Sequence, residues 1–271
     1  MSLDKVNAID VSRWQPNINW SCVAEQGIIF AALRASVSNY YTDPSYVLNA
    51  EGASRYGIIH PPYHVTRPDK LINGKDNSPK AQMDYFANVI EGHHDGVVVL
   101  DVELANVYGK TDVFHSKSLV TDVNMTCWEI AKTRYDQVYF YTRFSFIKDY
   151  MLSGISSYSD LDIWAAYYGK DDGKRYPLTK SQILPGFSIN QVVIHQYTSK
   201  GVGFCFNGPV LDYNYIMNQE RFNEIHKINS NEDPILVPGE TEIKVLEEQL
   251  RVLTLRIGEV ENRLNNAKLV L

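Results

Sequence analysis

The sequence predicts an α/β protein: a modified (β/α) barrel of about eight strands, followed by a C-terminal coiled-coil helix. Within residues 6–213, short apolar segments alternate with helical segments, which is typical of parallel βαβ units. Seven or eight strands in a segment of this length suit a closed barrel better than an open sheet. Beyond residue 240, apolar residues recur at steps of three and four, which is the spacing of a coiled coil.

The expected elements follow one another in regular order until the last two strands. The expected strands are 6–12, 28–34, 58–65, 97–103, 137–142, 161–167, 192–197 and 209–213. The expected helices are 21–26, 45–56, 79–91, 116–133 and 146–152. Pro61 and Pro62 fit only a strand end or a bulge, and Gly57 ends the preceding helix. The last two strands leave no room for a helix between them, so we expect an antiparallel pair there.

The chain divides into three expected parts. Residues 1–228 form the barrel, and residues 229–240, which contain Pro234 and Pro238, are typical of a linker. Residues 241–271 keep an a/d stripe that is narrower than the apolar face of most globular helices. We therefore expect this segment to self-associate rather than to fold onto its own barrel. The pattern leaves dimer, trimer and tetramer open.

Composition excludes several classes of partner. A net charge of −6 without a basic run argues against nucleic acid, and no apolar run approaches the length of a membrane span. The seven histidines lack zinc-site spacing, so we expect no metal and no cofactor. The first residues carry no signal peptide, so we expect a cytoplasmic protein. Cys22, Cys127 and Cys205 are scattered, and we expect buried thiols in a reduced cytosol rather than a disulfide.

The strand 97–103 carries the strongest indication of chemistry. Asp101 and Glu103 end an otherwise apolar strand and, at i and i+2, project from one face with Cα atoms about 6.6 Å apart. Two carboxylates this close raise the pKa of at least one of them, and a carboxyl that stays protonated near neutral pH can act as a general acid. The structural alternative is that one acid caps the next loop and the other pairs with a lysine or arginine.

Further acids, aromatic residues and an amide are expected at the ends of other strands. In a barrel of parallel strands these ends gather at one rim, where active sites lie. Carboxylates beside aromatic rings are typical of a carbohydrate cleft, because rings stack on sugars and acids act on acetal oxygens. The residues are Asp10, Tyr63, Tyr141, Trp164, Tyr167, Gln196 and Asp212.

Seven motifs follow one another along the chain in a specific order. They are Ala8-Ile9-Asp10-Val11-Ser12 with Trp14-Gln15, Tyr63-His64, Val99-Leu100-Asp101-Val102-Glu103, Tyr139-Phe140-Tyr141-Thr142, Ile163-Trp164-Ala165-Ala166-Tyr167, His195-Gln196-Tyr197 and Leu211-Asp212-Tyr213-Asn214. Over about residues 5–220 the set resembles glycoside hydrolase family 25, the Chalaropsis-type lysozymes, many of which are phage endolysins. The resemblance implies a modified β/α barrel and an N-acetylmuramidase that cuts the β-1,4 bond between N-acetylmuramic acid and N-acetylglucosamine in peptidoglycan.

The resemblance also implies roles for individual residues. Glu103 corresponds to the general acid, Asp101 to its partner acid, and Asp10 and Asp212 to two further acids of the cleft. At this stage we expect an ionised Asp101 to keep Glu103 protonated. His195 departs from the aromatic residue of many members, and we assign it no catalytic role. Expected contacts to the substrate come from Tyr63, Tyr141, Trp164, Tyr167 and Gln196.

Two rival interpretations remain at this stage. The chain could be a catalytically idle peptidoglycan-binding or virion structural protein assembled through its coiled coil, or a barrel enzyme acting on chitin. Repelling carboxylates at one rim argue against an idle site. The leading interpretation is a phage-type lysozyme that binds peptidoglycan glycan strands and itself, and that stays in the host cytoplasm until a membrane pore releases it. A retaining, an inverting and a substrate-assisted mechanism are all open.

Overall fold

We analysed a computed structural model of the chain. The structure describes residues 6–69, 71–72, 75–104, 115–202, 205–206, 208 and 210–228. The expected linker (229–240) and coiled-coil helix (241–271) lie outside the described residues.

Eight strands close into a barrel, as the sequence predicts. They are β1 (Ala8–Val11), β2 (Phe30–Val37), β4 (Pro62–Val65), β7 (Val97–Asp101), β8 (Gln137–Thr142), β9 (Asp162–Ala166), β10 (Val192–Gly201) and β11 (Leu211–Ile216). Neighbouring strands are parallel from β1 through β2, β4, β7, β8 and β9 to β10, whereas β11 is antiparallel to both β10 and β1. The expected antiparallel pair is therefore confirmed. A short strand, β3 (Tyr41–Thr42), extends β2, and β5 (Leu71–Ile72) pairs with β6 (Lys75–Asp76) in a separate hairpin.

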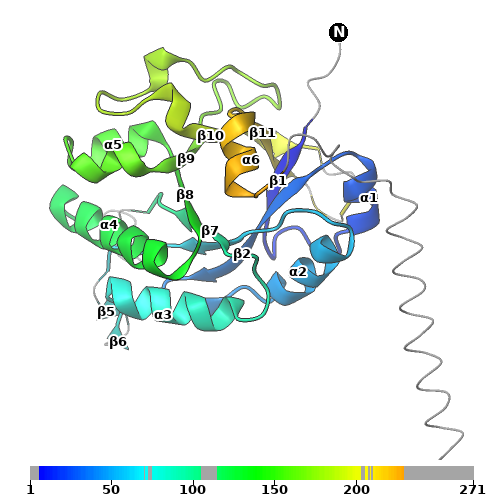
Figure 1. The fold of residues 1–271 in the computed structure, drawn as a ribbon, viewed down its shortest axis with the longest axis horizontal. Coiled ribbons are helices and arrows are strands. Elements are labelled where there is room, and N and C mark those ends of the chain that lie inside the picture. The colour runs from blue at the N-terminus through cyan, green and yellow to red at the C-terminus, as the bar shows by residue number, and fades with distance from the viewer. Residues whose placement is uncertain are drawn as a thin grey trace, which may run out of the picture.

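Helices surround the barrel on its outside (Figure 1). Side chains of Asn19, Ser78 and Ser116 accept hydrogen bonds from backbone N–H groups at three helix starts, which satisfies donors that the helices leave free. The helices are α1 (Trp20–Glu25), α2 (Tyr46–Arg55), α3 (Pro79–Ile90), α4 (Lys117–Arg134) and α5 (Phe144–Tyr150). Short 3-10 turns occupy Ser156–Asp160, Lys180–Gln182 and Ile189–Gln191.

Strand periodicity produces two apolar layers. In β7, Val98 and Leu100 belong to the layer between the strands and the outer helices, whereas Val97 and Val99 belong to the cluster inside the barrel. Because side chains alternate between faces, the next inward position is Asp101. The strand therefore needs apolar residues on both faces until its C-terminal end, where a carboxylate enters the barrel.

The helix α6 (Gln219–Ile225), which no sequence pattern had indicated, closes the other end of the barrel. Its Phe222 and Ile225 belong to the interior cluster, and the Phe222 ring contacts Phe30 edge-on at 5.7 Å. Tyr139 fills the same region, 3.1 Å from His226 Nε2 through its hydroxyl. With this end filled by side chains, only the C-terminal rim of the parallel strands is left for a cleft.

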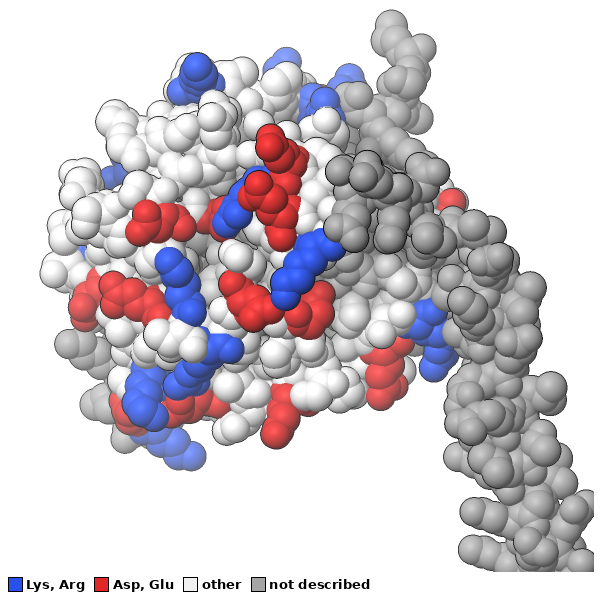
Figure 2. Space-filling view, viewed as in Figure 1, with Lys and Arg blue, Asp and Glu red and all other residues white. Residues whose placement is uncertain are grey.

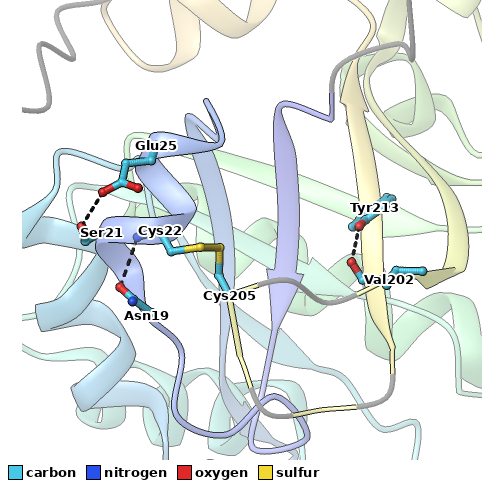
Figure 3. The surroundings of a disulfide bond; sticks show 7 residues. All are labelled: Asn19, Ser21, Cys22, Glu25, Val202, Cys205 and Tyr213. Carbon is cyan, nitrogen blue, oxygen red and sulfur yellow. Dashed lines mark hydrogen bonds between the residues drawn. A yellow bond between two sulfur atoms is a disulfide. The ribbon is translucent and has the colours of Figure 1, made fainter.

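The expectation of three free thiols is wrong for two of them. Cys22 on α1 and Cys205, in the connection between β10 and β11, form a disulfide with a Cα–Cα distance of 5.6 Å (Figure 3). The two cysteines lie 183 residues apart, so no spacing motif could indicate the bond. Their proximity follows from barrel closure, which brings β1 and α1 beside β11. Cys127 is free and buried, as expected.

Charged side chains of both signs are interspersed over the face in Figure 2. Ion pairs of the described residues include those of Arg221 with Asp162 and Glu224. Among the described helices, none is long and apolar enough to cross a membrane.

Candidate active site

A cleft of about 420 Å³ opens at the C-terminal rim of the barrel. Carboxylates, aromatic rings, two guanidinium groups and an amide line it. The lining residues are Asp10, Arg34, Val37, Tyr63, Val65, Val99, Asp101, Glu103, Leu104, Tyr141, Arg143, Trp164, Tyr168, Gln196, Ser199 and Asp212.

The four acids expected at this rim all line the cleft. Asp10 lies near the end of β1, and Asp101 ends β7, with Glu103 two residues beyond it. Asp212, however, lies near the beginning of β11 and not at its end. It reaches the same rim because β11 runs antiparallel to β1, in a register that places Asp212 opposite Asp10. The expected position of Asp212 at the rim is therefore correct, but the reason is different: the antiparallel β11 begins at this rim, whereas the parallel strands end there.

Two amide side chains hold the Asp10 carboxylate. The Gln196 Nε2 and Asn214 Nδ2 groups both donate to Asp10 Oδ2, at 2.9 and 2.8 Å. Trp164 in turn donates from Nε1 to Asn214 Oδ1 at 2.8 Å. Asn214 is completely buried, so its amide orientation is fixed by these partners. The result is a rigid chain of donors from the indole to the carboxylate.

The Gln196 amide is oriented from its other side by two tyrosines. Tyr141 donates to Gln196 Oε1 at 2.8 Å, and Tyr168 donates to the same oxygen. Because these hydroxyls occupy the amide oxygen, the amide nitrogen must face Asp10. Burial raises the pKa of both tyrosine hydroxyls, which keeps them protonated as donors.

Burial and a shared proton set the charges of Asp10 and Asp212. Burial raises the pKa of Asp10 to about 6, against the lowering effect of the Asn214 and Gln196 hydrogen bonds. Burial and the nearby Asp10 raise the pKa of Asp212 to about 9. A hydrogen bond between the two carboxyls lowers the pKa of Asp10 and raises that of Asp212. The pair thus keeps one proton near neutral pH, held mainly by Asp212.

Burial also raises the pKa of Asp101 and Glu103. It is the main cause for both, with the Glu103 and Asp10 charges as further causes at Asp101. Asp101 is the more deeply buried, and its Oδ1 atom has no hydrogen-bond partner among the described residues. The expected division between an ionised Asp101 and a protonated Glu103 therefore stays a prediction. Desolvation favours the protonated form of each of these two carboxyls.

Two arginines that sequence reasoning missed balance this acidic cleft. Arg34 forms an ion pair with Asp43 at 2.7 Å and lowers the pKa of Asp101. The Arg143 guanidinium lies 4.9 Å from the Tyr168 ring centroid and lowers the pKa of Glu103. One sequence signal could have found Arg34, because it is the only charged residue within the apolar segment of β2.

Of the five expected substrate contacts, one does not line the cleft and two line it but are almost completely buried. Tyr167 does not line the cleft, and its backbone bonds to Gln196 and His195 while its neighbour Tyr168 faces the cavity. Trp164 lines the cleft but is only 1% exposed, and its Nε1 atom donates to Asn214 Oδ1. Gln196 is 2% exposed and bonds to Asp10.

The two remaining expected contacts, like Trp164 and Gln196, line the cleft. Tyr63 and Tyr141 both face the cavity, and Tyr63 is half-buried. Among the described residues, no three His, Cys, Asp or Glu side chains are grouped so that they could hold a metal ion.

The arrangement defines a class of chemistry. Carboxyls with differently shifted pKa values occur together in one cleft, beside aromatic side chains. A carboxylic acid that donates a proton to an acetal oxygen, together with a carboxylate that stabilises the cationic sugar, is the apparatus of glycoside hydrolysis. The fold and the site together define a glycoside hydrolase.

Comparison with known proteins identifies the family. The chain belongs to glycosyl hydrolases family 25, whose family model matches residues 9–203. A curated relative, Lysozyme M1 of Streptomyces globisporus, is 41% identical over 83 residues, which are 31% of this chain and 26% of the relative. The match thus spans about a quarter of the length of that protein.

Solved structures have the same fold. The lysozyme of Streptomyces coelicolor is 28% identical, with a TM-score of 0.60 and coverage of 78% of this chain and 91% of that chain. A family 25 glycosyl hydrolase from Bacillus anthracis is 20% identical, with a TM-score of 0.63 and coverage of 83% and 94%. The CTP1L endolysin is 21% identical, with a TM-score of 0.61 and coverage of 82% and 70%.

Proposed function

We propose that this chain is a lysozyme that hydrolyses the β-1,4 bond between N-acetylmuramic acid and N-acetylglucosamine in bacterial peptidoglycan. The observation that carries the proposal is the convergence of Asp10, Asp101, Glu103 and Asp212 on one cleft in a family 25 barrel. Relatives named lysozyme, endolysin and muramidase support peptidoglycan as the substrate.

In the proposed reaction, Glu103 protonates the oxygen of the leaving sugar. A bound glycan would exclude water from the cleft, and further desolvation favours the protonated form of a carboxyl that burial already affects. Asp101, deeper in the cleft with a free buried oxygen, faces the reacting sugar. Asp10, fixed by Gln196 and Asn214, supplies negative charge that would stabilise a cationic transition state.

Analysis of reaction products tests the proposal. Digestion of purified peptidoglycan, followed by mass spectrometry, should give fragments with N-acetylmuramic acid at the reducing end. Fragments with reducing N-acetylglucosamine would refute the bond assignment. Binding without any soluble product would favour a catalytically idle peptidoglycan-binding protein. Cleavage of chitin alone would indicate a barrel enzyme that acts on chitin.

A pair of matched variants tests the general acid. Glu103→Gln keeps the size of the side chain but removes the proton donor, so wall lysis should fall at least 100-fold with the fold intact. Glu51→Gln on α2 has the same chemistry at an exposed position outside the cleft and should keep full activity. Near-normal clearing of wall suspensions by Glu103→Gln would refute the assignment.

We also propose that the protein is a phage endolysin that acts from inside the host after release from the cytoplasm. Its resemblance to endolysins, including one from a Listeria phage, supports this origin. The Cys22–Cys205 disulfide would then form after release, because the cytoplasm keeps thiols reduced. Expression in a susceptible host should cause lysis only when a membrane pore is co-expressed. Lysis without a pore would contradict the proposal.

Self-association through residues 241–271 remains part of the proposal. An oligomer would present several clefts to a polymeric substrate and gain avidity. Truncation after residue 228 should lower the mass measured by light scattering to that of a monomer and weaken action on whole walls more than on soluble fragments. An unchanged number of subunits after truncation would contradict it.

A further inference from the structure

A series of alternating guanidinium groups and aromatic rings leads out of the cleft. Arg34 lines the cleft, and its guanidinium carbon lies 5.7 Å from the ring centroid of Tyr41 on β3. The Arg13 guanidinium lies 5.3 Å from the same ring and 4.5 Å from the ring of Trp14. These four residues, here called the Trp14 platform, run without interruption from the cavity to the surface of the loop that follows β1.

A buried carboxylate holds the platform in place. Asp43 is 1% exposed, and its Oδ2 atom accepts from Arg34 Nε at 2.7 Å and from the backbone N–H of Arg13 at 3.2 Å. Its Oδ1 atom accepts from the backbone and the hydroxyl of Ser45, at 3.0 and 2.7 Å. One carboxylate therefore ties two members of the platform together, so its geometry is formed before any ligand arrives.

The outer end of the platform is an exposed indole. All four tryptophans of the chain are described, and Trp14 is 64% exposed, whereas Trp20, Trp128 and Trp164 are at most 6% exposed. A large ring in contact with water contributes little to the core. Indole rings with one wet face are typical of surfaces that bind amphipathic ligands such as sugars. The Arg13 guanidinium fixes the ring by a cation–π contact.

We propose that the outer end of the Trp14 platform is a second sugar-binding position, beyond the catalytic cleft, which holds a pyranose ring of the glycan strand on the Trp14 indole. The inference rests on the proposed function, because it takes the same polymer as the ligand. Arg34 and Tyr41 connect this position with the cleft. The ligand at Trp14 is therefore a further sugar unit of the same glycan strand that is bound in the cleft. The platform then favours long glycan strands over short fragments.

Fluorescence quenching can observe this contact directly, because Trp14 is the one tryptophan that acrylamide reaches easily. The probes are soluble oligosaccharides of alternating N-acetylglucosamine and N-acetylmuramic acid, with two or eight sugars, bound to the Glu103→Gln variant so that they are not cleaved. The eight-sugar probe should protect Trp14 from acrylamide and shift its emission to the blue, whereas the two-sugar probe should protect it less. The double variant with Trp14→Ala should lose the quenchable signal.

The outcomes separate the two proposals. Calorimetry that detects binding of the eight-sugar probe, without protection of Trp14, would overturn the platform and leave the proposed function standing. Failure of both probes to bind would overturn both.

Kinetics provide a second readout on the active enzyme. Trp14→Ala should raise KM for the eight-sugar oligosaccharide about 3- to 10-fold more than KM for the shortest oligosaccharide that is cleaved. Trp14→Phe should restore part of the difference. The matched control is Leu48→Ala on α2, an exposed apolar residue outside the platform that is 71% exposed, and it should change neither value. Equal effects of Trp14→Ala on both lengths would contradict the inference.

Discussion

The hydrogen bond from Trp164 to Asn214 links core stability to the charge of the site. Replacement Trp164→Phe removes the indole N–H and leaves Asn214 Oδ1, in a completely buried side chain, without its donor. An unsatisfied buried acceptor costs about 1–3 kcal/mol. The smaller ring also leaves space beside Phe30 and Tyr141, whose centroids lie 5.6 and 5.5 Å from that of Trp164, and this adds a packing loss.

A second tryptophan separates the two effects. Trp128 on α4 is 4% exposed, and its indole nitrogen makes no hydrogen bond to any residue that the structure describes. Trp128→Phe therefore changes volume at a buried position without removing a hydrogen bond. In urea denaturation, Trp164→Phe should lower the free energy of unfolding by about 1–3 kcal/mol more than Trp128→Phe does.

The same replacement should change the pH dependence of activity. Without Trp164, the Asn214 amide is free to turn away from Asp10, which weakens a hydrogen bond that lowers the pKa of that carboxyl. The pKa of Asp10 should then rise above about 6. The acidic limb of kcat/KM should move to higher pH in Trp164→Phe alone. Equal stability losses in both variants, together with unchanged pH profiles, would refute the reasoning.

Three further predictions concern charge and the disulfide. Arg143→Gln removes a charge that lowers the pKa of Glu103, so the alkaline limb of kcat/KM should move to higher pH, and a shift to lower pH would contradict this. Asp212 has a pKa raised from 3.8 to about 9 by folding, so the folded state binds the extra proton and loses stability as pH rises between these values. Asp212→Asn should therefore stabilise the protein at pH 8 more than at pH 4 in urea denaturation, and an equal gain at both would refute the shift. Cys22→Ser should lower the free energy of unfolding by about 2–5 kcal/mol, and a reductant should then destabilise the wild type but not the variant, because only the wild type has the bond to Cys205.

The alternation of apolar segments was sufficient to predict the barrel. Strand β7 shows why, since its residues are buried on both faces and only a barrel or sheet covered by helices provides such an environment. The period of two then placed Asp101 and Glu103 in one cleft. The helix α6 was missed because it follows the last expected strand, where the alternation of strands and helices had already ended.

Contacts between residues far apart in the chain could not be predicted from the sequence. The Cys22–Cys205 disulfide and the pairing of Asp10 with Asp212 depend on how β11 returns along β1, and neither leaves a local signal. The choice of Tyr168 over Tyr167, in contrast, follows the period of two: Trp164, Ala166 and Tyr168 belong to the interior cluster, whereas Ile163, Ala165 and Tyr167 belong to the outer layer. The expectation of Tyr167 did not follow this alternation to its end.

What the sequence by itself determined is therefore local and periodic: the strands, most helices, and the faces on which the acids lie. Only the tertiary structure decided how charge is distributed, because burial and neighbours from distant elements set each pKa. Arg34 reaches the acids from β2 and Arg143 from the start of α5, and Trp164 acts on Asp10 through Asn214. Such contacts exist only after the barrel has closed, since desolvation depends on every segment that surrounds the cleft.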